Sequence, residues 1–205
     1  MPRPQLVIFD LYGTLIQFGV KRHPFRNILQ WARQEGRSPK ADDVRTLMTL
    51  TGTPAEVFSI MGIFPPKPML TQLESDIEQE LVSLTLFEDV LITLNQLVDQ
   101  QIPIAVCSNL AQPYGAVINR LLPKVPLLQC LSYEVGYIKP EREIYQWIIE
   151  KAQVQPEQCL FVGDTFLADY EGPKHFGFQA RHLTRSQATG EDTLGTLTEL
   201  LDICK

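Results

Sequence analysis

Residues 6–15 have the sequence LVIFDLYGTL, and this stretch decides the class of the fold. Its first four residues are all apolar, which is typical of a strand that helices cover on both faces of a parallel sheet. The run ends in Asp10, and Gly13 follows in a turn where the backbone can approach a ligand closely. A carboxylate at a strand end is therefore a candidate for chemistry, although the same residue type there also caps helices.

Similar apolar runs recur along the chain, and amphipathic segments of helical length separate them. The runs span residues 102–107, 127–131, 159–162 and 178–183. This alternation predicts an α/β fold with a Rossmann-like, doubly wound parallel sheet and right-handed crossovers. We expect a final helix from about Asp192 to Cys204.

A long insertion separates the first two apolar runs. More than ninety residues lie between them, whereas an ordinary crossover needs only about a dozen or more. Residues 16–86 carry helix signals and no strand-like run, so we expect a small all-helical cap there. The α/β core is then built from residues 1–15 and 87–205.

Two helix starts can be placed within this cap from local signals. Residues 53–56, with the sequence TPAE, form a capping box with proline at the first helical position. Ser38 and Pro39 predict the start of another helix in the same manner.

The composition and charge of the chain exclude some classes of partner. A formal net charge of -6 argues against a protein that coats nucleic acid or an anionic membrane. The chain has no apolar run of about 18 residues and no signal-peptide pattern at its start, so we expect no membrane span. The four cysteines lack zinc-like spacing, which indicates reduced core residues of a cytoplasmic protein.

Polar residues close several of the apolar runs, at the edge of the sheet where ligands gather in such folds. Ser108 and Asn109 offer a hydroxyl and an amide at a helix start, and Lys139 stands just before another helix. Asp164 and Asp169 follow the fourth run. Taken singly, these are ordinary caps or solvated charges, but gathered acids invite a divalent cation.

The four strand-end segments, in this order and with a helical insertion between the first two, resemble the motifs of the haloacid dehalogenase-like (HAD) hydrolases. The resemblance covers residues 5–15 and 87–185. It implies that Asp10 is a nucleophile that forms a covalent aspartyl intermediate, which water then hydrolyses. It also implies that Ser108 and Lys139 hold the transferred group and offset its negative charge.

The phosphatase branches of this family imply a Mg²⁺ cofactor. Its ligands would be Asp10, Asp164 and Asp169, together with the backbone carbonyl of Tyr12. The three carboxylates sum to -3 and Lys139 returns +1, which leaves -2 to repel an anionic substrate. One Mg²⁺ brings the local charge to zero.

Tyr12 departs from the phosphatase pattern, because most of those enzymes have a second Asp there as general acid and base. Tyrosine, with an ordinary pKa of about 10, does not replace that acid easily near neutral pH. It resembles the 2-haloacid dehalogenases, whose first motif also reads Asp-x-Tyr-Gly-Thr. Their fourth motif, however, carries Ser and Asn where this chain has Asp164 and Phe166.

Three functions are therefore open. The first is a Mg²⁺-dependent phosphatase acting on a small phosphorylated metabolite. The second is a metal-independent 2-haloacid dehalogenase, and the third is a weakly active or non-catalytic binding relative. Tyr12 can also be an aromatic residue that packs the cap against the core.

We expect the substrate to be a small anionic molecule. Residues of the first and second motifs are placed to contact it, namely Tyr12, Gly13, Thr14 and Asn109. In the cap, four arginines fall within a sector of about 60° if one helix carries them all: Arg22, Arg26, Arg33 and Arg37. Arg22 and Arg26 are the best cap candidates for substrate binding, and a solvated basic face is the alternative.

Overall fold

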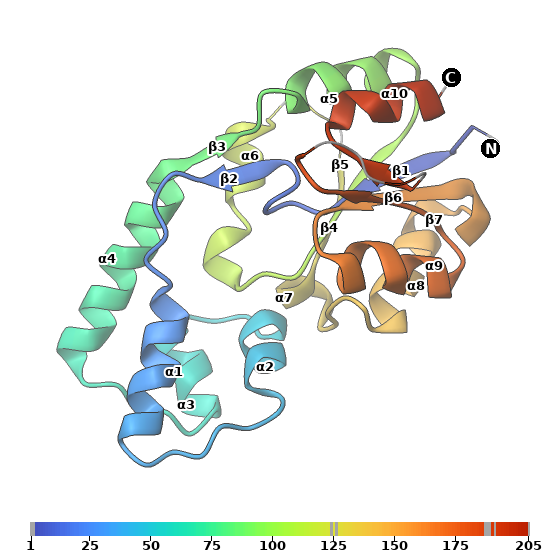
Figure 1. Cartoon of the computed structure of the whole chain (residues 1–205). Helices are drawn as coiled ribbons and strands as arrows, with labels where there is room; N and C mark the ends of the chain where they lie inside the picture. The colour runs from blue at the N-terminus through green and yellow to red at the C-terminus, as the bar shows by residue number, and fades with distance from the viewer. Residues whose placement is uncertain (1–2, 124, 126, 187–189, 191, 205) are drawn as a thin grey trace.

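A six-stranded parallel sheet forms the centre of the molecule (Figure 1). The computed structural model describes residues 3–123, 125, 127–186, 190 and 192–204. In spatial order the strands are β5 (Leu127–Leu131), β4 (Ile104–Ser108), β1 (Leu6–Phe9), β6 (Cys159–Gly163), β7 (Gln179–Leu183) and β8 (Thr193–Leu194). Every neighbouring pair is parallel, so the α/β fold expected from the sequence is confirmed.

Helices cover both faces of this sheet (Figure 1). One face carries α5 (Val90–Asp99), α6 (Val117–Leu121) and α10 (Leu200–Ile203), and the other carries α8 (Arg142–Ala152) and α9 (Gly172–Phe176). Because side chains alternate along a strand, Val7 and Phe9 pack with the first group whereas Leu6 and Ile8 pack with the second. The central strand β1 is consequently buried on both faces, as its apolar sequence predicts.

Short helical segments connect these elements. They are η1 (Gln112–Tyr114), α7 (Ser132–Val135), η2 (Pro156–Gln158), the π-helix η3 (Phe166–Glu171) and η4 (Leu197–Glu199). None of the described helices is both long enough and apolar enough to cross a membrane.

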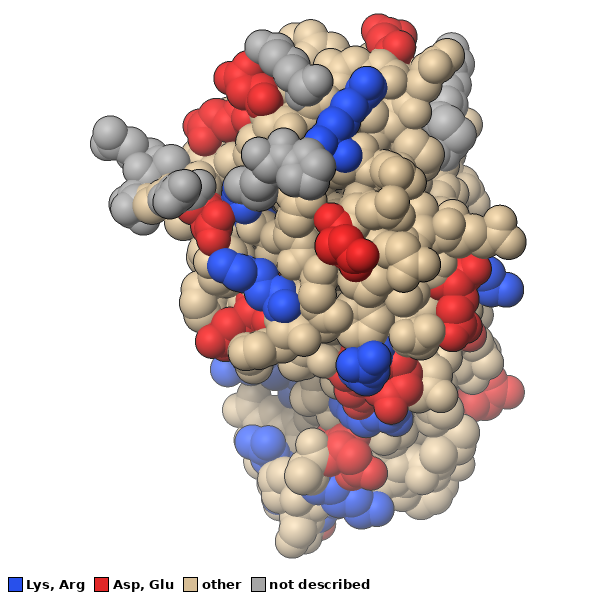
Figure 2. All heavy atoms as spheres, turned by 90° about the vertical axis from the view of Figure 1, so that its right-hand side faces the viewer, with Lys and Arg blue, Asp and Glu red and all other residues tan. Residues whose placement is uncertain are grey.

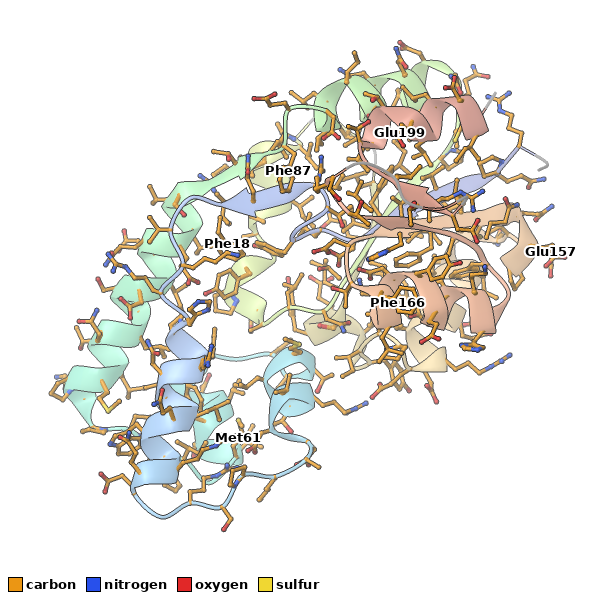
Figure 3. All side chains as sticks on the ribbon, in the orientation of Figure 1. Phe18, Met61, Phe87, Glu157, Phe166 and Glu199 are labelled. Carbon is orange, nitrogen blue, oxygen red and sulfur yellow. The ribbon has the colours of Figure 1, made fainter. Side chains whose placement is uncertain are left out.

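Four helices between β1 and β4 form a smaller body beside the core (Figure 1). They are α1 (Pro24–Gln34), α2 (Asp43–Thr49), α3 (Pro54–Ile60) and α4 (Lys67–Ser83). Their apolar faces meet in a separate cluster that includes Ile28, Phe58 and Leu73. Met61, labelled in Figure 3, lies among these helices as part of that cluster.

Two short strands carry the chain into and out of these helices. β2 (Ile16–Phe18) and β3 (Leu84–Leu86) pair antiparallel, with Ile16 opposite Leu86. The expectation that residues 16–86 contain no strand is therefore wrong. Three residues are too few for an alternating pattern to stand out, and their pairing partners are remote in the sequence.

The predicted helix starts in the cap had different outcomes. The capping box is confirmed, because the Thr53 hydroxyl accepts a hydrogen bond from the Glu56 N–H and the Glu56 carboxylate accepts from the Thr53 N–H. No helix starts at Ser38, and α2 begins only at Asp43. That prediction is wrong because the intervening loop is held by tertiary contacts of Asp43 that local sequence does not reveal.

The expected helix over residues 192–204 is also shorter than predicted. The His182 N–H donates to the carbonyl of Asp192 at 3.0 Å and the Thr184 N–H donates to that of Leu194 at 2.9 Å. These bonds add residues 193–194 to the sheet as β8. Pairing with β7, which ends ten residues before β8 begins, thus replaces the first turns of the helix.

A buried ion pair fixes the loop between α1 and α2. Both guanidinium nitrogens NH1 and NH2 of Arg37 donate to the carboxylate of Asp43, at 2.8 and 2.6 Å, and NH2 also donates to the carbonyl of Met61. The Lys40 N–H donates to the same carboxylate at 3.0 Å. The hydrogen bonds from Arg37 lower the pKa of Asp43 to about 2.

Replacing Asp43 with Asn should lower the free energy of unfolding by about 1 to 2 kcal/mol near neutral pH, because Arg37 loses its charged partner in a buried place. The folded pKa of about 2 lies below the ordinary value of 3.8, so the pair stabilises fully above that value and less as the pH falls toward 2. Denaturant unfolding at about pH 7 and about pH 3 measures this. The exposed Asp42→Asn is the control, and an Asp43→Asn effect of equal size at both pH values would contradict the interpretation.

Candidate active site

Asp10 lies at the carboxyl end of β1, between the ends of β4 and β6. Its N–H donates to the carbonyl of Val162 at 2.9 Å, which fixes its backbone in the sheet. Its Oδ1 accepts hydrogen bonds from Ser108 Oγ at 3.1 Å and from Lys139 Nζ at 2.6 Å. Among the described residues no hydrogen bond reaches Oδ2, so one oxygen of this buried carboxylate is held by two donors and the other by none.

Lys139 is buried between two carboxylates. Its Nζ donates to Oδ1 of Asp10 and to Oδ1 of Asp169, both at 2.6 Å. Burial favours a neutral amine, but the charges of Asp10 and Asp169 outweigh it and hold the pKa of Lys139 well above its usual value. Burial also raises the pKa of Asp10, which Lys139 opposes. Lys139 is therefore a charged group that donates a hydrogen bond directly to Asp10.

Asn109 fixes the backbone that carries this lysine. Its Nδ2 donates to the carbonyl of Lys139 at 2.8 Å, and its Oδ1 accepts from the Lys139 N–H at 2.7 Å. The amide side chain thus binds both polar groups of one residue. Asn109 positions Lys139, and its expected contact with substrate stays a prediction.

Three carboxylates gather where β1 and β6 end. Asp10, Asp164 and Asp169 each offer one oxygen, and these three oxygens lie within 4.8 Å of one another. The Thr14 hydroxyl donates to Asp164 Oδ1 at 3.5 Å, and the Thr165 N–H donates to Asp169 Oδ2 at 2.9 Å. Burial and the neighbouring Asp169 raise the pKa of Asp164, as is expected for acids crowded together without a cation. Carboxylate oxygens are the ligands that Mg²⁺ prefers, so this donor set fits that ion.

Two glycines leave the space that these carboxylates occupy. A Cβ on Gly13 would lie 2.3 Å from Oδ2 of Asp164, and the φ of Gly13 is +92°. A Cβ on Gly163 would lie 2.4 Å from Cγ of Asp169. Any side chain at either position would collide with an acid of the cluster. Gly13 therefore shapes the cluster through Asp164, and its expected contact with substrate is untested.

The side chain of Tyr12 lies at the junction of cap and core, where its hydroxyl is occupied by a hydrogen bond. Its hydroxyl donates to the backbone carbonyl of Tyr114 at 2.9 Å, and its ring stacks on Phe18 of β2 at 5.1 Å. Burial raises its pKa well above the usual value. These contacts favour the packing interpretation of Tyr12. The expected metal contact through its carbonyl stays a prediction.

The contacts of Glu80 at this junction were not predicted from the sequence. The hydroxyl of Tyr114 donates to Oε2 of Glu80 at 2.5 Å, and Oε1 of Glu80 accepts from the N–H groups of Arg22 and His23. Glu80 is buried although it carries a charge. One signal was present in the sequence, because Glu80 falls on the apolar face of α4 at helical spacing from Leu73 and Ile77.

A partly open cavity of about 770 Å³ lies between cap and core, and none of the three carboxylates is among its lining residues. Tyr12 and Asn109 line it from the core, and Arg26 lines it from the cap. Arg22 is not among the lining residues, and its Nε donates to Oε1 of Gln79 at 3.2 Å. The condition that one helix carries all four arginines is not met, because α1 spans only Pro24–Gln34. Its N-cap, His23, has a left-handed conformation that breaks the helix there.

Replacing Gly13 with Ala should weaken Mg²⁺ binding by about tenfold or more, because the new Cβ displaces Asp164. Gly62→Ala is a matched control, since Gly62 also has a positive φ, +72°, but no atom lies within 4 Å of its Cβ position. Both substitutions carry a similar backbone strain of about 1 kcal/mol. Titration calorimetry with Mg²⁺ compares them, and equal affinities in the two variants would contradict the assignment.

The sequence matches a family model described as haloacid dehalogenase-like hydrolase over residues 4–177. A relative from Schizosaccharomyces pombe, described as an uncharacterized hydrolase, is 33% identical over 61 residues. That stretch spans 27% of this chain and 27% of the relative. The relative is thus similar over a part of its length only.

Solved structures resemble the whole chain. A HAD phosphatase from Thermococcus onnurineus is 22% identical, with 97% of this chain and 96% of that chain covered and a TM-score of 0.65. A 2-haloacid dehalogenase from Pseudomonas syringae is 17% identical, with 97% and 96% covered and a TM-score of 0.62. A HAD family enzyme from Bacteroides thetaiotaomicron, in complex with magnesium and inorganic phosphate, is 18% identical, with 90% and 96% covered and a TM-score of 0.61.

At these identities the solved structures establish the fold alone. The family model reaches further, because residues 4–177 include all five strand-end groups described above: Asp10, Ser108, Lys139, Asp164 and Asp169. The chain therefore belongs to the haloacid dehalogenase-like hydrolases.

Proposed function

We propose that this hydrolase is a Mg²⁺-dependent phosphatase in which Asp10 is the nucleophile. The observation that carries the proposal is the asymmetric environment of Asp10. Ser108 and Lys139 both donate to Oδ1, while Oδ2 accepts no hydrogen bond from the described residues, and Asp164 and Asp169 lie close to this carboxylate. A carboxylate held on one side and free on the other is oriented for attack.

In the first step, Oδ2 of Asp10 attacks the phosphorus atom and the bond to the leaving oxygen breaks. This produces an aspartyl phosphate, and the leaving oxygen departs as an alkoxide or carboxylate that takes up a proton from solvent. Water then attacks the phosphorus and gives up its proton to the departing phosphate or to solvent, which releases phosphate and restores the Asp10 carboxylate. Ser108 Oγ and Lys139 Nζ are placed to donate to the phosphoryl oxygens as negative charge develops there.

Charge favours a bound cation in this reaction. The three carboxylates and Lys139 sum to -2, a charge that would repel a phosphate dianion bound beside Asp10. Mg²⁺ held by Asp10, Asp164 and Asp169 would neutralise this charge and polarise the phosphoryl group. The Bacteroides enzyme, which binds magnesium and phosphate, and the Thermococcus phosphatase support this choice.

A 2-haloacid dehalogenase is the second candidate, and Tyr12 is the observation that favours it. The similarity to the Pseudomonas dehalogenase agrees with this reading at the level of fold. Against it stands Asp164, which adds a third carboxylate beside the place where an anionic haloacid would bind. Halide release from 2-haloacids in the presence of a metal chelator tests this candidate.

Mg²⁺ and fluoroberyllate together should raise the melting temperature by several degrees, because fluoroberyllate mimics the phosphoryl group on Asp10 and the cation binds beside it. Each component alone should have a much smaller effect. In Asp10→Asn the joint effect should vanish, since the nucleophilic oxygen is lost. Thermal unfolding of both proteins with each combination measures this.

Failure of the joint shift in the wild type would contradict the phosphatase proposal. Halide release from a 2-haloacid would then support the dehalogenase, and its absence would support a non-catalytic relative. Asp202→Asn, far along the chain in α10, is the control that should retain the full shift.

Acyl phosphates should be hydrolysed faster than alkyl phosphates by about a hundredfold or more, because Tyr12 does not supply the general acid that a poor leaving group needs. Tyr12→Phe should then change the rate on both substrates little. Steady-state kinetics with acetyl phosphate and glycerol phosphate, corrected for spontaneous hydrolysis, measure both effects. Equal rates on the two substrates, or a large loss in Tyr12→Phe, would contradict this role of Tyr12.

A further inference from the structure

The cavity between cap and core is larger than the phosphoryl site needs. Its volume of about 770 Å³ lies in the range of sites that enclose a whole drug-sized ligand. It lies near the proposed phosphoryl site, because Tyr12 and Asn109 line it and closely follow Asp10 and Ser108 in the chain. On the face drawn in Figure 2, a hollow separates the larger core above from the cap below, with Lys and Arg residues around it. The cavity is therefore placed to receive the rest of the substrate.

One face of α1 forms the cap side of this cavity. Arg26, Leu29, Gln30 and Arg33 all line it, and their spacing of three, four and seven residues puts them on one side of a helix. At a rise of about 1.5 Å per residue, the two arginines are about 10 Å apart along the axis. The helix starts beside the core and runs away from it (Figure 1), so Arg33 lies farther from the core than Arg26.

These two arginines have no partner in the described part of the chain. Neither guanidinium makes a hydrogen bond or an ion pair there, whereas that of Arg37 is bound to Asp43 and that of Arg22 to Gln79. Lys21 adds a third cation to the lining of the cavity.

The one acid among the lining residues, Glu80, offsets only part of the charge of Lys21, Arg26 and Arg33. Glu80 already accepts hydrogen bonds from the hydroxyl of Tyr114 and from two backbone N–H groups. Its carboxylate is thus engaged at the junction of cap and core. The cavity wall on α1 keeps an excess of positive charge, which favours an anionic ligand.

The rest of the wall is mostly apolar. Phe18, labelled in Figure 3, lies where β2 meets the cap and lines the cavity. Other apolar and aromatic lining residues come from both bodies: Phe25, Leu47, Met48, Leu110 and Tyr114. A ligand that fills this space must expose apolar surface along its length.

We propose that the substrate is a phosphate monoester whose leaving group is elongated and largely apolar and ends in a second anionic group. Arg26 and Arg33 bind that second anion, and the apolar wall contacts the body between the two charges. This inference rests on the proposed phosphatase function, which supplies the position of the phosphoryl group. A phosphate ester of a very small acid would leave most of the cavity unfilled, so the proposal excludes such esters as the preferred substrate.

The test uses two esters that differ at one end. One is hexyl phosphate, and the other is hydroxyhexanoate phosphorylated on its terminal hydroxyl, which ends in a carboxylate. Titration calorimetry with the full-length Asp10→Asn protein and Mg²⁺ measures the affinity for each ester without turnover. The carboxylate ester should bind about tenfold or more tightly, because charge-assisted hydrogen bonds from arginine are strong.

Arg26→Gln and Arg33→Gln, each in the Asp10→Asn protein, should reduce this preference while the affinity for hexyl phosphate changes little. Arg142→Gln removes the same charge from an exposed position on α8 and should keep the preference. Equal affinity for the two esters, or a preference that survives both arginine substitutions, would overturn the inference. Turnover by the wild type is a separate readout, so a preference without hydrolysis would count against the phosphatase proposal alone.

Discussion

The site depends on the buried contact of Lys139 with Asp10 and Asp169. Each of the three groups would be costly to bury by itself, and together they satisfy one another at 2.6 Å. They come from separate segments, after β5, after β1 and in η3, and they meet because parallel strands end at the same edge of the sheet. The spatial order of β4, β1 and β6 places Asp10 at the centre. The local helices and turns then serve to hold each partner, as Asn109 does for Lys139.

The sequence predicted positions in the fold well where a candidate site residue ends an apolar run. The places of Asp10, Ser108 and Asp164 could be predicted because a buried strand stops at or just before each of them. It was a poor guide where two distant segments decide the outcome. The strand β2, the direction of the Tyr12 hydroxyl and the burial of Glu80 all depend on partners that are remote in the chain. The cap arginines were grouped too widely because His23 breaks the helical register.

Polar contacts between cap and core reach residues next to Lys139 in the chain. Arg45 of α2 donates to the carboxylate of Glu141 at 2.6 and 3.0 Å, and Glu141 also accepts from the N–H of Ile138. Lys139 lies between these two core residues in the chain. The position of the cap is thus linked to the loop that carries the central lysine, and the same cap supplies one wall of the cavity.

The paired strands β2 and β3 connect the cap to the core at one place, so the cap can vary independently of the core. Because Ile16 and Leu86 are paired, the polypeptide leaves and re-enters the core at one place. A helical insertion of another length or sequence can therefore be joined to these paired strands without disturbing the register of β1 with its neighbours. Selection on the cap can then act on which compounds are recognised, while the residues that carry out bond cleavage remain under separate constraint.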